Sequence, residues 1–220
     1  KKYQIFKNLK TFKNMSSSRS QQLEYFLQGS IEESSLSSLR HRLKGLCDPS
    51  TTHNKFADHE IVYGLRPHTG ASSITLRARC SLDSPEMPWQ LRYLGEADQV
   101  AEKSKNVLTR ACLEVMTTDN LTTFLEELGF GFEREYVAKG YYFKKGDIRV
   151  TISRIHRLPT RGNTSHAEAI SSSYLVEASV VSSVQQDSIG DELKSFTEQL
   201  RPIVHLEKVD HRKIQLLGSK

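Results

Sequence analysis

Carboxylates that stand two residues apart are the arrangement in this sequence with the clearest catalytic potential. Asp58 and Glu60 form one such pair, and Glu133 and Glu135 form another. Side chains two apart on a β-strand share a face, where paired carboxylates can bind a divalent metal and a following lysine can bind phosphate. Valine stands at the lysine position after both pairs. The sequence therefore predicts no metal site, no cofactor and no catalytic residue at either pair.

Other catalytic motifs are missing from the sequence. It has neither a glycine-rich phosphate loop ending in Lys-Ser or Lys-Thr nor a GxSxG element. His59-Glu60 begins like a zinc-protease motif, yet no histidine follows three residues after the glutamate. Cys47, Cys80 and Cys112 are far apart and form no CxxC pair, so we interpret them as isolated reduced thiols.

Positive charge is concentrated at the beginning of the sequence. The formal charge is +5, and residues 1–14 hold five lysines and no acidic residue. The remainder is formally neutral, which gives little support to a nucleic-acid-binding surface. We expect residues 1–19 to be a disordered basic leader; the alternative is an arm that binds DNA or a nuclear-import patch. Arg77, Arg79 and Arg92 are interpreted as charged positions on the outer face of the domain.

The length and apolar content fit a single core. A chain of 220 residues can bury roughly 70% of its unfolded surface. No run approaches the ~18 consecutive apolar residues of a membrane-spanning helix. We expect residues 20–220 to form one domain without a membrane segment.

Three helices are predicted from apolar side chains at helical spacing: Glu33–Leu46, Asn120–Leu128 and Ser188–Leu200. In the second helix, Asp119 is expected to cap the N-terminus and Gly129 to take the left-handed conformation after the C-terminus. That helix is expected to bury one apolar stripe, Leu121, Phe124, Leu125 and Leu128.

The rest of the sequence alternates between apolar and polar residues, as β-strands do. About eight strands result, too many for the helices to cover from both sides. An antiparallel sheet closed into a barrel, with helices packed outside or at one end, leaves no exposed edges. The predicted fold class is therefore α+β, a single mainly antiparallel β-barrel with about three helices packed on it.

A hairpin is predicted with its two-residue loop at Lys145-Gly146, which places Lys144 opposite Asp147. One face of the hairpin is expected to be buried near the loop. Further from the loop, Lys139 and Arg154 on the same face are expected to point into the barrel or toward its rim. The buried residues of that face are Tyr141, Phe143, Ile148 and Val150. The opposite face, expected to meet solvent, carries Ala138, Tyr142, Arg149, Thr151 and Ser153.

Seven sequence blocks stand in a distinctive order. They read QLEYFLQGSI, LRHRLKGLCD, WQLRYLGE, NLTTFLEELGF, EYVAKGYYFKKG, SYLVEASVV and EQLRPIVHLEKVD. In order and spacing they resemble the subunit 18 family of the Mediator complex, the coactivator of RNA polymerase II. The resemblance implies a barrel and a nuclear, non-enzymatic scaffold subunit of the head module. It also implies a heterodimer with Mediator subunit 20 and tethering by a helix of Mediator subunit 8, with RNA polymerase II reached indirectly.

Two alternatives stay open in the sequence. A barrel with inward-facing basic residues also resembles the triphosphate tunnel enzymes, so the alternative function is a metal-dependent polyphosphate or nucleoside triphosphate phosphohydrolase. After Pro202, Ile203, Val204 and Leu206 are more apolar than a free tail requires. We interpret them as candidate partner-binding residues; the alternative is that they close the chain's own barrel.

Overall fold

The computed structural model describes residues 22–49, 55–65, 73–97 and 106–209 of the chain. Eight antiparallel strands close into a barrel in the order β6-β2-β3-β4-β5-β1-β9-β7, with β7 pairing back to β6, which agrees with the fold class predicted from the sequence. The barrel strands are β1 (Gln22–Ile31), β2 (Lys55–Leu65), β3 (Ile74–Ser81), β4 (Trp89–Leu94), β5 (Leu108–Thr117), β6 (Gly131–Lys145), β7 (Ile148–Arg157) and β9 (Tyr174–Ser182). The two-residue strand β8 (Glu168–Ala169), preceded by a 3-10 turn at Thr164–His166, pairs with the end of β7.

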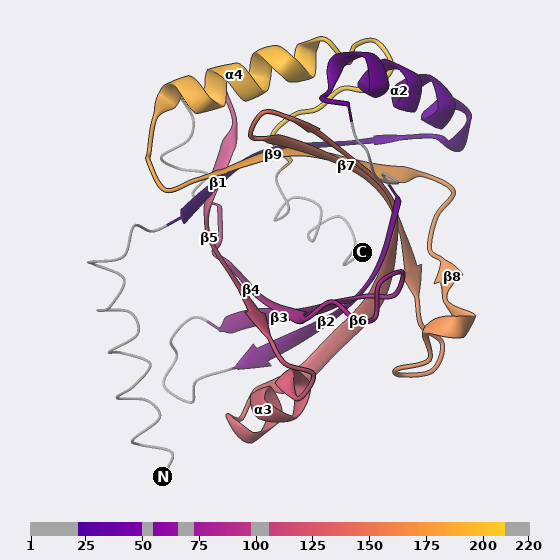
Figure 1. Ribbon diagram of the computed structural model, residues 1–220, viewed down its shortest axis with the longest axis vertical. Coiled ribbons are helices and arrows are strands. Elements are labelled where there is room, and N and C mark those ends of the chain that lie inside the picture. The colour runs from indigo at the N-terminus through magenta and orange to yellow at the C-terminus, as the bar shows by residue number, and fades with distance from the viewer. Residues whose placement is uncertain (1–21, 50–54, 66–72, 98–105, 210–220) are drawn as a thin grey trace, which may run out of the picture.

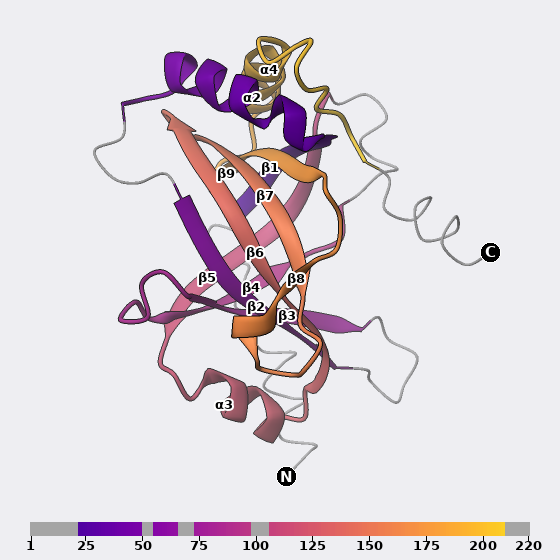
Figure 2. The ribbon, with the colours of Figure 1, turned by 90° about the vertical axis from the view of Figure 1, so that its right-hand side faces the viewer.

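Within the described residues, three α-helices lie on the outside of the barrel (Figure 1 and Figure 2). Helices α2 (Glu33–Leu46) and α4 (Asp187–Glu198) lie together over β1, β9 and β7, and α3 (Leu121–Glu127) lies at the far end of the barrel. The first and third helices match their predicted positions closely. No helix in the described ranges is long and apolar enough to cross a membrane.

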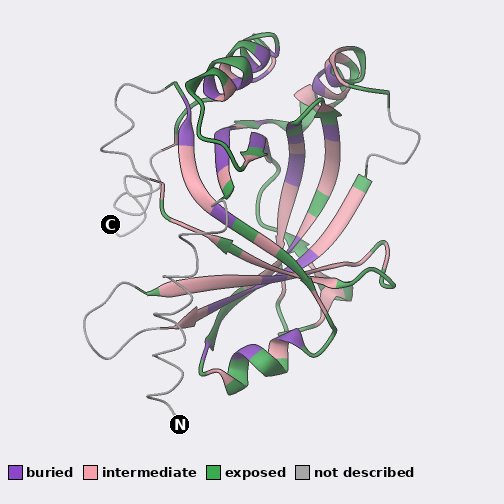
Figure 3. Cartoon of the chain, turned by 60° about the vertical axis from the view of Figure 1, so that its left-hand side comes forward, coloured by how far each residue is buried: buried purple, intermediate pink, exposed green. Residues whose placement is uncertain are grey.

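The apolar cores lie between the barrel wall and the helices. The larger core joins Leu39 and Leu43 of α2 and Leu193 of α4 to outward-facing strand residues such as Tyr25 and Val150. The buried positions recur along each helix at the spacing of one face (Figure 3). A smaller core packs α3 on β2 and β3. Both cores use the outer face of the wall, and the inner face carries the charged residues together with a few apolar ones such as Phe26 and Val62.

The second helix differs from its prediction at two positions. Asn120, not Asp119, precedes the first helical residue, and its side chain forms no capping hydrogen bond. Phe124 is 51% exposed, because α3 has only seven residues and turns Leu121 and Leu125 toward the barrel instead. Gly129 has a φ of 92°, as predicted for the residue that ends the helix.

The β6–β7 hairpin forms with its loop one residue later than predicted. Lys145 pairs with Ile148 and Phe143 with Val150, so the loop is Gly146-Asp147. A two-residue hairpin loop needs a positive φ at its first position, which glycine adopts more readily than lysine. Gly146 has a φ of 56°. The predicted register was therefore wrong, while the prediction that Phe143, Ile148 and Val150 are buried on one face is confirmed, with Tyr141 half-buried beside them.

Candidate functional site: the charged interior of the barrel

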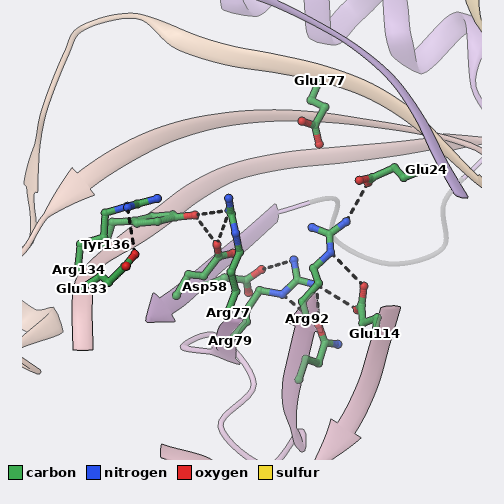
Figure 4. Close-up of polar contacts among 12 residues, drawn as sticks. Glu24, Asp58, Arg77, Arg79, Arg92, Glu114, Glu133, Arg134, Tyr136 and Glu177 are labelled. Atoms are coloured by element: carbon green, nitrogen blue, oxygen red, sulfur yellow. Dashed lines mark hydrogen bonds and ion pairs between the residues drawn. The ribbon is translucent and has the colours of Figure 1, made fainter. Parts of the chain in front are cut away.

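Acidic and basic side chains line the inside of the barrel (Figure 4). They come from strands all around the wall, at positions that alternate with the apolar residues of the outer cores. We call this set the bore network: Glu24, Asp58, Glu60, Arg77, Arg79, Arg92, Arg110, Glu114, Tyr136 and Glu177. The pairs join neighbouring strands and also strands two apart, so the network braces the barrel from within.

Glu24 on β1 is the most buried member of the bore network, with 1% of its surface exposed. Its Oε1 accepts from Arg92 Nη2 of β4 at 2.8 Å, and its Oε2 accepts from Arg110 Nε of β5 at 2.7 Å. The Arg110 guanidinium also lies 4.1 Å from the centre of the Phe26 ring. Burial alone would lower the pKa of Arg92, but Glu24 together with Cys112, Glu114 and Glu177 raises that pKa above its usual value. One carboxylate thus accepts hydrogen bonds from two arginines on neighbouring strands.

Glu60 on β2 is the second carboxylate of the bore network that accepts more than one hydrogen bond. Its Oε1 accepts from Arg77 Nη1 at 2.9 Å and from the Tyr136 hydroxyl in a short hydrogen bond. Burial would raise the pKa of Glu60, yet Arg77 and the Tyr136 hydroxyl together lower it. Burial and the neighbouring Glu60 carboxylate raise the pKa of Tyr136. The tyrosine therefore stays protonated and serves as a donor, not as a base.

Arg79 forms further contacts inside the barrel, with Gln90, Glu114 and Asp58. Its Nε donates to Gln90 Oε1 at 3.0 Å, and its Nη2 lies 3.2 Å from Glu114 Oε1. Asp58 is 3.9 Å from Arg79 Nη1, and burial raises the pKa of this carboxyl more than Arg79 lowers it. On the opposite wall, Gln28 Nε2 donates to Glu177 Oε2 at 2.7 Å.

The bore network leaves little open to a metal or a phosphate. Among the described residues, no three His, Cys, Asp or Glu side chains are grouped as metal ligands would be. Carboxylates that could bind a cation, such as Glu24 and Glu60, face guanidinium groups at hydrogen-bonding distance. The arginines that could bind a polyanion are occupied by the same contacts. Chemically, the arrangement is a set of internal ion pairs.

The second predicted carboxylate pair lies apart from this network. Glu135 faces outward, where its Oε2 is 2.8 Å from His59 Nε2 and its Oε1 accepts from the Gly162 amide at 2.7 Å. Glu133 lies 3.9 Å from Arg134 Nη1, a half-exposed contact. Asp58 and Glu60 point toward the arginines of the bore, and Glu133 lies with Arg134 beside Tyr136 (Figure 4).

Several side chains face the opposite way from the prediction. Arg77, Arg79 and Arg92 were expected on the outer face, and they point into the bore (Figure 4). Arg154, expected inside or at the rim, lies outside, where it contacts Glu33 of α2 at 3.0 Å and stacks over the Tyr174 ring.

The hairpin shows the same reversal. Lys139 is exposed and pairs with Arg154 on the outward face. The residues expected to meet solvent share the inward face, where Ser153 is buried and Thr151 pairs with Glu177 of β9. The physical reason is that the helices cover the apolar face from outside, so the polar face closes around the bore.

The predicted partner-binding segment is packed against the chain itself. Val204 and Leu206 are buried in the larger core, and Ile203 is half-buried at its edge. Just beyond them, the Glu207 amide donates to the Gln28 carbonyl at 2.9 Å, and the Glu207 carbonyl accepts from the Gln28 amide at 3.1 Å. The segment therefore continues the sheet beside β1, at the point where β5 has ended. Whether it also binds a partner stays a prediction.

Sequence reasoning missed the bore network, although a signal was present. Glu24 interrupts the apolar run of β1, and charged residues stand at alternating positions of the next strands, as acids in β2 (Asp58, Glu60) and as arginines in β3 (Arg77, Arg79). Complementary charges at period two on successive strands, with apolar residues between them, indicate a polar interior in a closed barrel.

Comparisons with known proteins agree on one family. The model of the Med18 protein family matches residues 23–215. Mediator of RNA polymerase II transcription subunit 18 from Danio rerio is 47% identical over 192 residues, which cover 87% of this chain and 91% of that protein. The Drosophila melanogaster subunit 18 is 41% identical over 194 residues, covering 87% and 88%.

A solved structure has a similar fold. A chain in the structure of the Schizosaccharomyces pombe Mediator head module superposes with a TM-score of 0.68 at 17% identity, covering 85% of this chain and 98% of that one. This likeness shows the shared barrel, and the sequence match over nearly all of the described strands and helices shows the family. The chain belongs to the Med18 protein family.

Proposed function

We propose that this chain is a non-enzymatic scaffold subunit of the Mediator head module, which acts in the nucleus and helps to convey regulatory signals to RNA polymerase II. The observation that carries the proposal is the family match over residues 23–215. It is supported by relatives that bear the name Mediator subunit 18 over most of their length. The likeness to a chain of a Mediator head module supports association with other head subunits.

The bore network supports the absence of catalysis in this proposal. A tunnel phosphohydrolase needs free carboxylates for metal and free basic groups for phosphate. Here Glu24 is held by Arg92 and Arg110, and Glu60 by Arg77. Breaking these ion pairs would leave buried charges without a partner, which lowers the stability of the fold. A barrel of this kind acts through its outer surface.

The partners that we propose are Mediator subunit 20, as a heterodimer, and Mediator subunit 8, through a tethering helix. The C-terminal segment that contains Ile203, Val204 and Leu206 is the candidate contact. Because Val204 and Leu206 are buried in this chain, we expect a partner to meet Ile203 and the exposed side of that segment. An Ile203→Asp variant should weaken the complex, whereas Ile170→Asp, at a residue that is 61% exposed next to β8 and outside this segment, should not.

Co-expression tests the assembly. Residues 20–220 carrying an affinity tag should retain untagged Mediator subunits 8 and 20 through affinity and size-exclusion chromatography. Each of the two subunits passed alone over the resin is the control for non-specific retention. Failure of both to co-purify would remove the main support for a scaffold.

An assay of phosphate release tests the alternative. The purified chain with Mg²⁺ or Mn²⁺ should release no phosphate from tripolyphosphate or a nucleoside triphosphate. Hydrolysis that is abolished by Glu60→Gln, in the bore, or by Glu133→Gln, on the second pair, would show that the barrel is an enzyme.

A further inference from the structure

Two like charges stand opposite each other on the outer face of the β6–β7 hairpin. Lys139 of β6 pairs with Arg154 of β7, and Lys139 is exposed. Opposite charges at such positions stabilise a sheet, whereas like charges that face each other destabilise it. Arg154 has a carboxylate partner, Glu33 of α2 at 3.0 Å, but within the described residues the Lys139 ammonium group forms no ion pair. A position that lowers stability in this way is often kept for binding a ligand.

Two more cations lie next to this pair. Helix α2 lies beside β6 (Figure 2) and places the Arg40 guanidinium 3.9 Å from the centre of the Tyr141 ring. Tyr141 stands two residues from Lys139 on the same face of β6, and Lys55 of β2 pairs with it from the other side. We call Arg40, Lys55, Lys139 and Arg154 the basic patch.

The basic patch carries more positive charge than the chain around it neutralises. Among the described residues, Glu33 is the one carboxylate within ion-pair distance of the patch, and its side chain is 63% exposed. The Nε atom of Arg40 is buried and has no hydrogen-bond partner. The arginines of the bore network, in contrast, all face carboxylates. The patch therefore favours a compact ligand with more than one negative charge.

The two tyrosines of this region indicate which kind of anion fits. The Arg40 guanidinium covers the Tyr141 ring, and the Arg154 guanidinium lies 4.3 Å from the centre of the Tyr174 ring. Both rings also pack against the larger core, so neither has a free face on which a nucleic-acid base could stack. A guanidinium that is stacked on a ring is held in one plane, from which it can bind phosphate oxygens in a bidentate manner.

We propose that the basic patch binds a phosphorylated serine or threonine side chain of a partner polypeptide. A phosphate monoester carries nearly two negative charges at neutral pH and three acceptor oxygens. One such group can therefore contact Lys139, Arg154 and Arg40 together, and it competes with a carboxylate only at Arg154. The site lies within one chain, so it does not depend on the Mediator partners proposed above.

A peptide library tests the basic patch on the purified full chain. Three immobilised pools have randomised flanks around a central phosphoserine, serine or glutamate. The phosphoserine pool should retain at least ~10-fold more of the chain than the serine pool, as expected for hydrogen bonds between charged groups. The lysines of residues 1–14 are present in every variant, so they do not affect a comparison between variants.

The Lys139→Glu variant separates binding from folding. It should reduce retention on the phosphoserine pool to the level of the serine pool. Its melting temperature should nevertheless rise by about 1–3 °C, because an opposite-charge pair with Arg154 replaces a like-charge pair. Arg134→Glu is the matched control, since it makes the same charge change on the same strand at a side chain that is 60% exposed; its retention should equal that of the unmodified chain.

A second substitution tests the guanidinium from α2. Arg40→Gln should lower retention on the phosphoserine pool ~10-fold, because it removes a charged donor. Full retention of the folded Lys139→Glu variant, or equal retention of the unmodified chain on the serine pool, would overturn the site. Equal retention on the glutamate pool, or displacement of the chain by single-stranded DNA, would overturn phosphoserine as the ligand.

Discussion

The outer and inner faces of the barrel wall bury different kinds of side chain. Outside, the wall is mainly apolar, and α2, α4 and α3 cover much of it. Inside, it is lined by charges that neutralise one another, with Glu24 as buried as the apolar residues Leu27 and Val150. Apolar packing tolerates many partners of suitable volume, whereas a buried carboxylate needs particular donors in particular places. The inside therefore specifies the closed geometry, and the outside supplies most of the stabilisation.

The largest effect is expected inside the wall. Glu24→Gln removes the charge shared by Arg92 and Arg110 and leaves two buried guanidinium groups without their carboxylate. Breaking a buried ion pair in this way lowers the free energy of unfolding by about 3–5 kcal/mol. Urea unfolding followed by circular dichroism measures it. The control Glu114→Gln, at a more exposed carboxylate on β5, should lose less than about 1 kcal/mol; equal losses would contradict the central role of Glu24.

Outside the wall, a single truncation should have a somewhat smaller effect. Leu43 of α2 is fully buried in the larger core, and Leu43→Ala leaves a cavity that lowers the free energy of unfolding by about 3 kcal/mol. Leu113→Ala, at a residue of β5 that is 46% exposed, is the control and should change the free energy of unfolding by less than about 0.5 kcal/mol. Differential scanning calorimetry of the isolated chain measures both.

The contact between the two outer helices should contribute less again. Arg42 of α2 donates from Nη1 to the Arg201 carbonyl at 2.7 Å and to the Gln199 carbonyl at 3.1 Å, just after α4. These carbonyls have no partner within the helix, so the arginine caps its C-terminus. Arg42→Ala should lower the free energy of unfolding by about 1 kcal/mol, because the bonds are solvent-exposed. Arg42→Lys should restore part of it; no change in either variant would show that water replaces the cap.

The elements were more predictable from the sequence than the direction their side chains face. Helices α2 and α4 follow from leucines at helical spacing, and β1 from its alternation. Alternation, however, only divides a strand into two faces. Which face is inside depends on where α2 and α4 pack, a long-range contact that period two does not encode. For that reason Arg77 and Arg154 were assigned to the wrong sides, and the bore network was not foreseen.

The contribution of Glu60 to stability can be measured from how the free energy of unfolding changes with pH. Burial opposes the charged form, but Arg77 and Tyr136 hold the pKa of Glu60 below its usual 4.5. The unfolded chain then binds the proton more tightly, so this carboxylate stabilises the fold above about pH 4.5 and loses its effect as pH falls through the lower folded pKa. The stability difference between the unmodified chain and Glu60→Gln should therefore shrink on acidification below pH 4.5.

The pH dependence that Asp58 contributes to stability should have the opposite sign to that of Glu60. Burial raises the pKa of its carboxyl above 3.8 despite Arg79, so the folded chain binds this proton more tightly and gains stability as pH falls through the folded value. The difference between the unmodified chain and Asp58→Asn should change in the opposite direction to that of Glu60→Gln over the same range. Urea midpoints at intervals between pH 3 and 6 measure both; parallel curves would show that neither carboxylate titrates as its surroundings require.

The smallest effect is expected from the basic leader, residues 1–19, which lies outside the residues that the structure describes. Its charge is of one sign and its apolar residues alternate poorly, so it should add little to either side of the wall. Deleting residues 1–19 should leave the melting temperature within about 2 °C of the full chain. A larger drop, reproduced by Phe6→Ala and Phe12→Ala in the full chain, would mean that the leader docks on the barrel. In that case the outer layer would include a segment that its composition does not predict.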